Sequence, residues 1–334
     1  MAKLLRARYT DGVMKEILVT SASDGQRIEK FVRHYLSEAP LGFIYKAFRK
    51  KDIKINGHWV NKEAIVHSGD VVRIYVTDAQ LEDFKKPRPV NKKPFPYPIA
   101  YEDDAVLIVD KPKGLLVYGD AKGSRETLGN AVLDYLYLKG EYDPAESSFT
   151  PSPAHRLDRN TSGLVVYGKT DAALHKLTEL FKDRTEIHKK YLALVAGDLE
   201  KDGEIDAPLW KDAMNGRVYV RSIEAGGKNA LTRYEIVKRY GAYTMVKVEL
   251  VTGRTHQIRV HFASIGHPLV GDEKYGLVSV NRISKEKTGL ESQFLHASEL
   301  SFGRLSGVLS PLANKKIVSP LPKELANVLE LLVK

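Results

Sequence analysis

One aspartate, in a turn rich in polar residues, is the residue of this sequence best suited to chemistry. Asp158 is flanked by Arg156 and Arg159, and the chain then runs through residues 160–163 into the apolar run 164–167. Catalytic groups tend to lie on loops held by rigid elements, and arginine beside aspartate keeps the carboxylate ionised. The pattern suits a nucleophile or an anionic general base. A capped turn with a surface ion pair is the alternative, and on spacing alone it is the more common case.

Residues 155–169 resemble the signature of the RluA-type pseudouridine synthases, enzymes that isomerise uridine in ribosomal and transfer RNA. Further motifs of that family follow in the family's order. They are Lys111-Pro112-Lys113-Gly114, Lys190-Tyr191-Leu192-Ala193, residues 252–261, Gly271-Asp272 with Tyr275-Gly276, and Leu295-His296-Ala297. Several independent motifs in the right order are far more specific than one, and together they extend the resemblance over roughly residues 98–325.

The resemblance implies an isomerisation in which the N-glycosidic bond breaks, the base turns, and the sugar is rejoined to carbon 5. Nothing is oxidised, so we expect no cofactor. Asp158 matches the carboxylate that acts at the sugar, as a nucleophile or as a base in a glycal route. Tyr191 matches the tyrosine that stacks on the base and assists proton removal, although a core tyrosine is the alternative. Arg259 matches the arginine that pairs with the aspartate, and we prefer it to Arg254, which we expect to contact phosphate or the pocket.

A base inside folded RNA has to leave the stack before an enzyme can act on it. Arg156 aligns with the residue that fills the gap left by the flipped base in relatives, since a planar guanidinium both stacks and forms hydrogen bonds. We expect His155 to take part in that contact. A surface ion pair with Asp158 is the alternative for Arg156.

The first part of the chain predicts a small α/β domain. Residues 26–36 carry an apolar stripe at helical spacing, a second helix begins near Phe43, and Asn56-Gly57 between short apolar runs predicts a hairpin. This pattern resembles the S-four-like RNA-binding domain, also called the alpha-L motif. We assign residues 1–77 to it, with short N-terminal strands.

The second helix ends in three cations, Arg49, Lys50 and Lys51. Cations in a last turn suit the helix dipole, and the same exposed end is where RNA phosphates could dock. Both readings stay open, and we include the three residues among the candidate RNA-binding groups.

Residues 78–98 interleave lysine and arginine with five prolines, a composition typical of a semi-rigid linker. The catalytic domain is then expected over residues 99–334. Its many strands lack regular alternation with helices, which favours an α+β fold with a mixed, largely antiparallel sheet.

Residues 255–265 predict a helix, with Thr255 as its cap and Gly266 as its stop. His256 and His261 lie five positions apart, about 140° around such a helix, which is a poor spacing for a metal pair. We therefore expect no metal site.

The formal net charge of +10 indicates a polyanionic partner, for which nucleic acid is the first choice. The chain has no cysteine, no apolar run long enough for a membrane span and no apolar signal segment at its start. We expect a cytoplasmic monomer without a membrane partner.

The combination of the two domains is most similar to the RluC kind, which predicts large-subunit ribosomal RNA, free or in a pre-ribosomal particle, as the substrate. Transfer RNA is an alternative substrate. A non-catalytic RNA-binding assembly factor is a rival from another class, although it would not need Asp158 and Tyr191. A hydrolase pairing Asp158 with His256 or His261 is a further rival, which would need a second acid or a metal.

Overall fold

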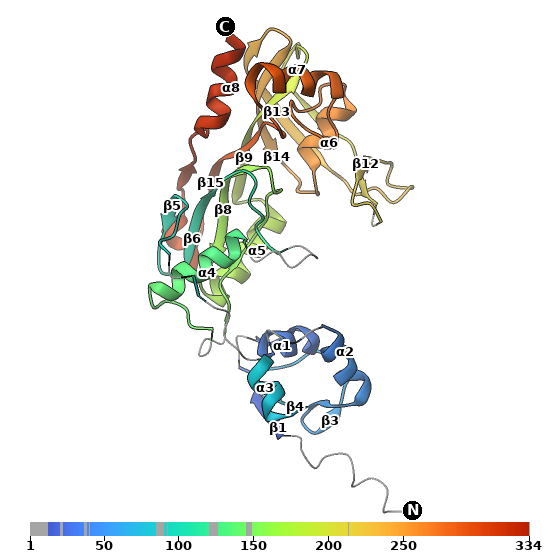
Figure 1. Ribbon diagram of the computed structural model, residues 1–334, viewed down its shortest axis with the longest axis vertical. Helices are drawn as coiled ribbons and strands as arrows, with labels where there is room; N and C mark the ends of the chain where they lie inside the picture. Colours follow the sequence, from blue (N-terminus) through green and yellow to red (C-terminus); the bar gives the residue numbers. More distant parts are fainter. Residues whose placement is uncertain are drawn as a thin grey trace, which may run out of the picture. The chain divides into compact units, whose positions relative to one another are not determined.

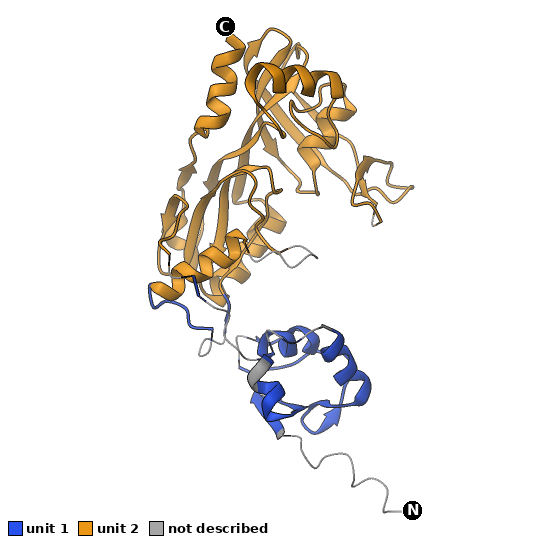
Figure 2. Cartoon of the chain, in the orientation of Figure 1, with its two compact units in different colours: residues 1–91, 139–150 blue, residues 92–138, 151–334 orange. Residues whose placement is uncertain are grey.

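The computed structural model describes residues 13–20, 23–36, 39, 41–84, 90–91, 93–119, 126–144, 149–212 and 214–333. The chain divides into two compact units, shown in blue and orange in Figure 2. Unit 1 comprises residues 1–91 and 139–150, and unit 2 comprises residues 92–138 and 151–334. Each unit has a hydrophobic core of its own.

Unit 1 contains a four-stranded antiparallel sheet in the order β1-β4-β2-β3, packed with short helices. Its elements are β1 (Val13–Leu18), α1 (Ile28–Tyr35), α2 (Leu41–Lys50), β2 (Ile53–Ile55), β3 (His58–Trp59), β4 (Val71–Val76) and α3 (Asp78–Phe84). Ile28, Ile44 and Ile74 are buried in its core and join the helices to the sheet. Asn56 and Gly57 both have positive φ, as a tight hairpin turn requires.

The linker expected over residues 78–98 starts later than its composition suggests. Its first residues form α3, where Leu81 is buried in the core of unit 1 and the ring of Phe84 lies 4.6 Å from that of Phe43. These apolar side chains gain more by packing on the core than an extended linker would allow. Residues 1–12, where part of the N-terminal strands was expected, lie outside the described residues, as do 85–89 and 92.

Unit 2 is built on one large sheet (Figure 1). The path of the sheet is β10-β13-β14-β9-β15-β8-β6-β5, with β16 paired to β15 and β7 to β8. Its strands are β5 (Ile99–Glu102), β6 (Val106–Lys111), β7 (Ser152–Pro153), β8 (Ser162–Gly168), β9 (Ile187–Ala196), β10 (Gly203–Asp206), β13 (Leu231–Tyr240), β14 (Tyr243–Leu250), β15 (Leu295–Phe302) and β16 (Lys316–Val318). A separate hairpin pairs β11 (Leu209–Lys211) with β12 (Val218–Val220). Among the described residues, the strand pairs of the large sheet are antiparallel except β15 with β8, which confirms the predicted α+β class.

The helices of unit 2 are short and pack on the sheet or on each other. They are α4 (Leu128–Leu138), α5 (Asp171–Asp183), α6 (Gln257–Ser264), α7 (Val278–Thr288), the 3-10 helix η2 (Gly307–Leu312) and α8 (Lys323–Val333). The buried face of α5 carries Ala173, Leu177 and Phe181 at helical spacing, and its start is capped by the Thr170 side chain. Within the part of the chain that the structure describes, no helix combines the length and apolar character needed to cross a membrane.

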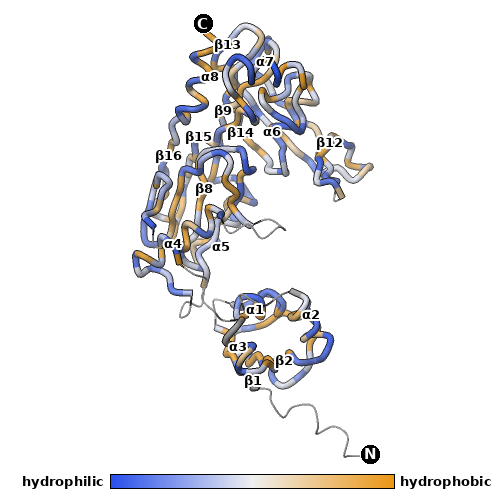
Figure 3. Tube along the Cα trace, viewed as in Figure 1, coloured by the Kyte–Doolittle hydropathy of each residue, from blue (hydrophilic) through white to orange (hydrophobic). Residues whose placement is uncertain are grey.

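The strand β8 lies between β15 and β6 in the sheet, and its residues are all buried. Figure 3 shows the apolar residues gathered along β8 and its neighbours. Val106, Ile108, Leu164 and Val166 form one cluster with the apolar face of α5. A strand buried on both faces reads as a continuous apolar run, and this is why residues 164–167 were recognisable in the sequence.

Gly163, at the start of β8, is the residue on which the parallel junction with β15 depends. Its φ is +111°, and a Cβ built there would lie 2.2 Å from the carbonyl oxygen of Ala297. We expect Gly163→Ala to destabilise the chain by about 3 kcal/mol, because strain and a backbone clash add. Chemical denaturation followed by circular dichroism measures this change.

Gly266→Ala is the matched control, since Gly266 has a φ of +84° but open space around its Cβ position. Backbone strain alone predicts that Gly266→Ala lowers the free energy of unfolding by about 1 kcal/mol. Equal losses for the two variants would contradict the role assigned to the β8–β15 contact.

Candidate active site

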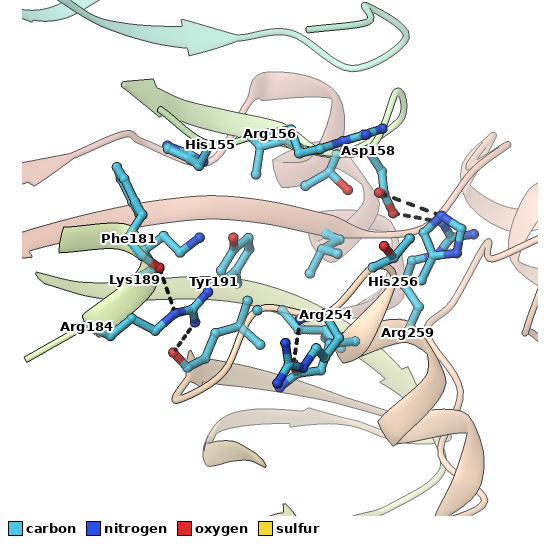
Figure 4. A pocket seen from close by; sticks show the side chains of 18 of the residues that line it. His155, Arg156, Asp158, Phe181, Arg184, Lys189, Tyr191, Arg254, His256 and Arg259 are labelled. Carbon is cyan, nitrogen blue, oxygen red and sulfur yellow. Dashed lines mark hydrogen bonds and ion pairs between the residues drawn. The ribbon is translucent and has the colours of Figure 1, made fainter. Parts of the chain in front are cut away.

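A cavity of about 380 Å³ lies beside Asp158 (Figure 4). Its walls come from segments far apart in the sequence: residues 154–158 before β8, the end of α5 with Arg184, the start of β9, and residues 253–259. The residues lining it include all three side chains expected to be catalytic, Asp158, Tyr191 and Arg259. The fold therefore brings together what the sequence separates by about a hundred positions.

A single guanidinium joins the two carboxylates of the site. Arg259, on α6, donates from Nη1 to Asp158 Oδ2 at 2.8 Å. Its Nε and Nη2 donate to the two oxygens of Asp272 at 2.7 and 2.8 Å. Such a two-point contact fixes the guanidinium plane as well as its charge. Arg259 thus binds Asp158 through its third nitrogen, and it is the arginine that we preferred to Arg254 as the partner of Asp158.

Asp272 is the partner that the sequence did not reveal. Its side chain is fully buried and also accepts backbone N–H bonds from Lys274 and Tyr275. Burial alone would raise the pKa of Asp272, but the bonds from Arg259 and from the two amides outweigh it and lower the pKa. Burial would lower the pKa of Arg259, whereas Asp272 and Asp158 raise it. Both groups therefore stay charged at neutral pH.

The loop before α6 is closed by one buried glutamine. The Oε1 of Gln257 accepts from the backbone N–H of Arg254 and from the hydroxyl of Thr252, and its Nε2 donates to Leu231 O. The helix consequently begins at Gln257 with His256 as its N-cap, one residue later than the expected cap Thr255, and ends at Ser264. The capping prediction was wrong because the loop is held by the glutamine side chain, not by a helix cap.

His256 lies next to Asp158 in this loop, in the left-handed conformation with φ 53°. Its Nε2 is 3.8 Å from Asp158 Oδ1, and its Nδ1 is hydrogen-bonded to the hydroxyl of Tyr275 at 2.8 Å. Burial lowers the pKa of His256, with Asp158 opposing the shift. The imidazole is thus neutral at pH 7. No sequence pattern indicated its contact with Tyr275.

Tyr191 lies on β9 and is only 4% exposed. Burial raises the pKa of the phenol, Arg184 lowers it and Asp158 raises it, and the net shift is upward. The phenol is therefore neutral at physiological pH and serves as a flat wall and a hydroxyl, not as a phenolate.

Lys111, the last residue of β6, ties the Asp158 loop to the sheet. Its Nζ donates to the carbonyl oxygens of Pro112, Leu115 and Arg159 at 2.9, 2.9 and 3.0 Å. Burial lowers the pKa of this amine to about 7, and Asp158 partly opposes the shift. In the sequence Lys111 is part of a family motif with no role of its own, whereas here it fixes the turn that carries Asp158.

The residues expected to contact RNA near the cavity differ in what they do. Arg156 is exposed at the cavity edge (Figure 4). Arg254 is also exposed, with its Nε donating to Asn229 O at 3.0 Å. His155 is part of the wall instead, since its Nε2 accepts the N–H of Val166 and its ring packs 4.3 Å from that of Phe181.

Burial lowers the pKa of His155 well below its usual value. The Nε2 of this neutral ring is committed to a backbone bond, which gives His155 a structural role in the cavity wall, and its contact with RNA stays a prediction. Its neighbour in the sequence, Arg156, keeps its side chain free for the solvent side of the cavity.

In unit 1, Arg49, Lys50 and Lys51 are all exposed at the end of α2. Lys51 has a positive φ of 63° and its Nζ lies 5.0 Å from the centre of the Trp59 ring. The three cations and the aromatic ring form one accessible corner of the unit.

Within the described residues, no group of three or more His, Asp or Glu side chains could hold a metal ion. His256 binds Tyr275, while His261 is hydrogen-bonded to Thr232 Oγ1 and to Ala207 O, both at 2.9 Å. The two histidines thus serve separate parts of the structure.

Comparisons with known proteins agree with the geometry of the cavity. A model of the RNA pseudouridylate synthase family matches residues 105–264. Ribosomal large subunit pseudouridine synthase C of Vibrio cholerae is 33% identical over 306 residues, 90% of each chain, and that of Escherichia coli is 34% identical over 294 residues, 86% of this chain and 88% of the other. This chain belongs to the RNA pseudouridylate synthase family.

The fold of this chain is shared with two solved structures. The human RNA pseudouridylate synthase domain-containing proteins 4 and 1 superpose with TM-scores of 0.56 and 0.50 at 22% and 24% identity. They cover 70% and 74% of this chain, and 92% and 97% of their own. The resemblance drawn from the motifs to the RluA-type synthases is confirmed, and the assignment of an isomerase acting on RNA with it.

Because Asp272 holds Arg259, we expect Asp272→Asn to lower both the free energy of unfolding and the rate of pseudouridine formation. Removing one partner of a buried ion pair costs about 3–5 kcal/mol, and it frees the guanidinium that orients Asp158. The lowered pKa of Asp272 stabilises the fold above the unfolded-state value of about 4, and this contribution disappears as the pH falls further. The difference between variant and wild type should therefore shrink below pH 4 in denaturation experiments.

Glu273→Gln is the control, because this neighbouring carboxylate is exposed. It should leave both stability and turnover close to those of the wild type. An Asp272→Asn protein as stable and active as the wild type would show that Arg259 does not depend on Asp272.

Proposed function

We propose that this synthase converts specific uridines of large-subunit ribosomal RNA to pseudouridine. The observation that carries the proposal is the ion pair between Arg259 and Asp158 at the mouth of a cavity, in a chain that matches ribosomal large subunit synthases over nine-tenths of its length. The same relatives support ribosomal RNA over transfer RNA as the substrate.

In the proposed reaction Asp158 is the reacting carboxylate. Its Oδ1 faces His256 and its Oδ2 is held by Arg259, so that its position is fixed before RNA binds. Two routes are open: attack on the sugar carbon, or removal of a sugar proton to give a glycal. Both need an ionised carboxylate and neither needs a cofactor.

Tyr191 provides the surface on which the target uracil lies. Its neutral phenol suits stacking, and its hydroxyl assists removal of the carbon 5 proton only as a relay, by passing its own proton to a base as it accepts the new one. Arg259 is then a positioning residue, because it acts through Asp158 and is itself held by Asp272.

The RNA contacts are assigned to cations outside the reaction centre. Arg156 fills the place of the flipped base, and Arg254 contacts phosphate at the rim. Unit 1 serves as the S-four-like RNA-binding domain, with Arg49, Lys50 and Lys51 as its phosphate contacts. We further propose that the enzyme acts in the cytoplasm as a monomer, on free RNA or on a pre-ribosomal particle.

Release of tritium from RNA labelled at uracil carbon 5 tests the reaction, because the new carbon–carbon bond displaces that atom. Wild type should release tritium from unmodified large-subunit RNA and not from transfer RNA. Asp158→Asn should lose release by at least about 10⁴-fold while it still binds RNA, because only the reacting charge is removed.

Asp104→Asn, which changes an exposed aspartate away from the cavity, is the matched control and should behave as wild type. Release from transfer RNA alone would replace the substrate assignment. Full activity of Asp158→Asn would remove this residue from the reaction.

The cations at the end of α2 make a second test. In the double variant Arg49→Gln, Lys50→Gln, the affinity for RNA should fall. The slope of the logarithm of the RNA association constant against the logarithm of the salt concentration should become shallower by roughly 1–2, because two phosphate contacts are lost. The rate at saturating RNA should not change. Filter binding at several salt concentrations measures the slope.

The control variant, Lys285→Gln with Lys287→Gln, removes two exposed cations from the last turn of α7. A purely general charge effect predicts the same loss from both pairs. A specific surface on unit 1 predicts a loss only from the α2 pair.

A further inference from the structure

Lys189 is a buried lysine inside the cavity that the reaction scheme above does not use. It is 9% exposed, and it lies on the same face of β9 as Tyr191, two residues and roughly 7 Å away along the strand. Figure 4 shows its side chain directed into the cavity. Its Nζ lies 5.2 Å from the centre of the Phe181 ring, and no carboxylate of a described residue forms an ion pair with it.

A second cation is fixed behind it. Arg184 follows α5 with a positive φ of 66°, and its Nε and Nη1 donate to Phe181 O and Leu250 O, both at 3.1 Å. Its guanidinium occupies the space that a side chain on Gly253 would fill. A non-glycine residue in this conformation is strained, so the position of Arg184 is specified by its surroundings.

The charges around Lys189 are mostly positive. The titratable groups nearest to it in the cavity wall are His155, Lys182, Arg184 and Tyr191, with Asp158 at the far end beside Arg259. Its register partner on β15 is Leu300, an apolar residue. Burial and then Arg184 lower the pKa of the Lys189 amine to about 7, and no acidic group opposes the shift. The free enzyme thus holds an unneutralised cationic end facing Tyr191.

The reaction creates a negative charge at this place. When the bond between C1′ and N1 breaks, its electron pair stays on the base, spread over N1, O2 and O4, while C1′ bonds to Asp158 or the sugar loses a proton to it. When C5 joins C1′ the pair forms the new bond, and either the bond from C1′ to Asp158 breaks with its electrons returning to the carboxylate, or the glycal takes its proton back. The C5 proton then leaves, and N1 takes up a proton, so the product is neutral. Between these steps the base is an anion, and fixed charge directed at an anion lowers the barrier to forming it.

We propose that Lys189, supported by Arg184, is a catalytic residue that binds the detached uracil anion through its carbonyl edge. The inference rests on the proposed synthase activity. Asp158 and Arg259 serve the sugar at one end of the cavity, and Lys189 serves the base at the other. When the anion forms, the ammonium ion gains the partner that the free enzyme lacks.

A planar base fits this place better than a backbone phosphate does. The walls around Lys189 are the rings of Phe181, His155 and Tyr191, which suit a flat apolar face. Phosphates stay at the rim, where the exposed cations Arg156 and Arg254 lie.

The test compares Lys189→Met, Lys189→Arg and wild type in tritium release from large-subunit RNA under single-turnover conditions. Lys189→Met should slow release by about 10²-fold with unchanged RNA affinity. The kcat/KM of wild type should fall as the pH rises through about 7, because the amine loses its charge. Lys189→Arg should retain more activity than Lys189→Met and show no such fall.

Lys190→Met is the matched control, since Lys190 is the next residue of β9 and lies on the opposite face. It should release tritium at the wild-type rate. Lys189→Met should also melt at a higher temperature than wild type, because an unpaired buried amine is replaced by an apolar chain of similar length. The melting temperature therefore shows whether a slower release of tritium comes from the lost amine or from an unfolded protein.

Three results would overturn the proposal. The first is an unchanged rate in Lys189→Met. The second is weaker binding with a shallower salt dependence and a normal rate at saturation, which would identify a phosphate contact. The third is a wild-type rate that rises through pH 7, which would make the neutral amine a base. Wild-type release from transfer RNA alone would refute the proposed substrate, and the Lys189 comparison would then be made on that RNA.

Discussion

The contact on which the active site depends is the one between Arg259 and the buried carboxylate of Asp272. It leaves Arg259 Nη1 free for Asp158. Buried ion pairs give uncertain net stability, because desolvation of both charges offsets their attraction. Their firm contribution here is direction: three bonds fix the guanidinium, and the backbone amides of Lys274 and Tyr275 fix Asp272 in turn. Asp158 is therefore oriented by a structure that exists before RNA binds.

The loop that carries Asp158 is held just as firmly from its other side. Lys111 binds the carbonyl of Arg159, and Gly163 allows β8 to approach β15 in their parallel pairing. Lys111 on β6 and Gly163 on β8 lie opposite each other, because they are register partners on these neighbouring strands. A reacting carboxylate on a turn gains its precision from such anchors, because the turn itself has few contacts of its own.

Much of this could be predicted from the sequence, and the failures have physical causes. The many strands without regular helical alternation indicated the fold class, and the motif around Asp158 indicated the family, since both are patterns visible along the chain. The contact of Asp272 with Arg259 is invisible to such patterns, because it joins residues 13 positions apart through side-chain geometry. The start of α6 was misplaced because Gln257 closes the loop with its side chain, and the bond of His155 to Val166 could not be predicted because it exists only in the folded sheet.

The cavity as a whole shows how the two ends of one reaction can be served by opposite arrangements of charge. At Asp158 the charge is balanced: one carboxylate faces one guanidinium, whose remaining bonds go to a second carboxylate. At Lys189 it is unbalanced, with Arg184 adding to the positive charge and no acid nearby. An unbalanced buried cation costs stability, so a fold retains it where an anion arrives during turnover. The asymmetry thus matches a bond cleavage in which the sugar becomes electron-poor and the base electron-rich.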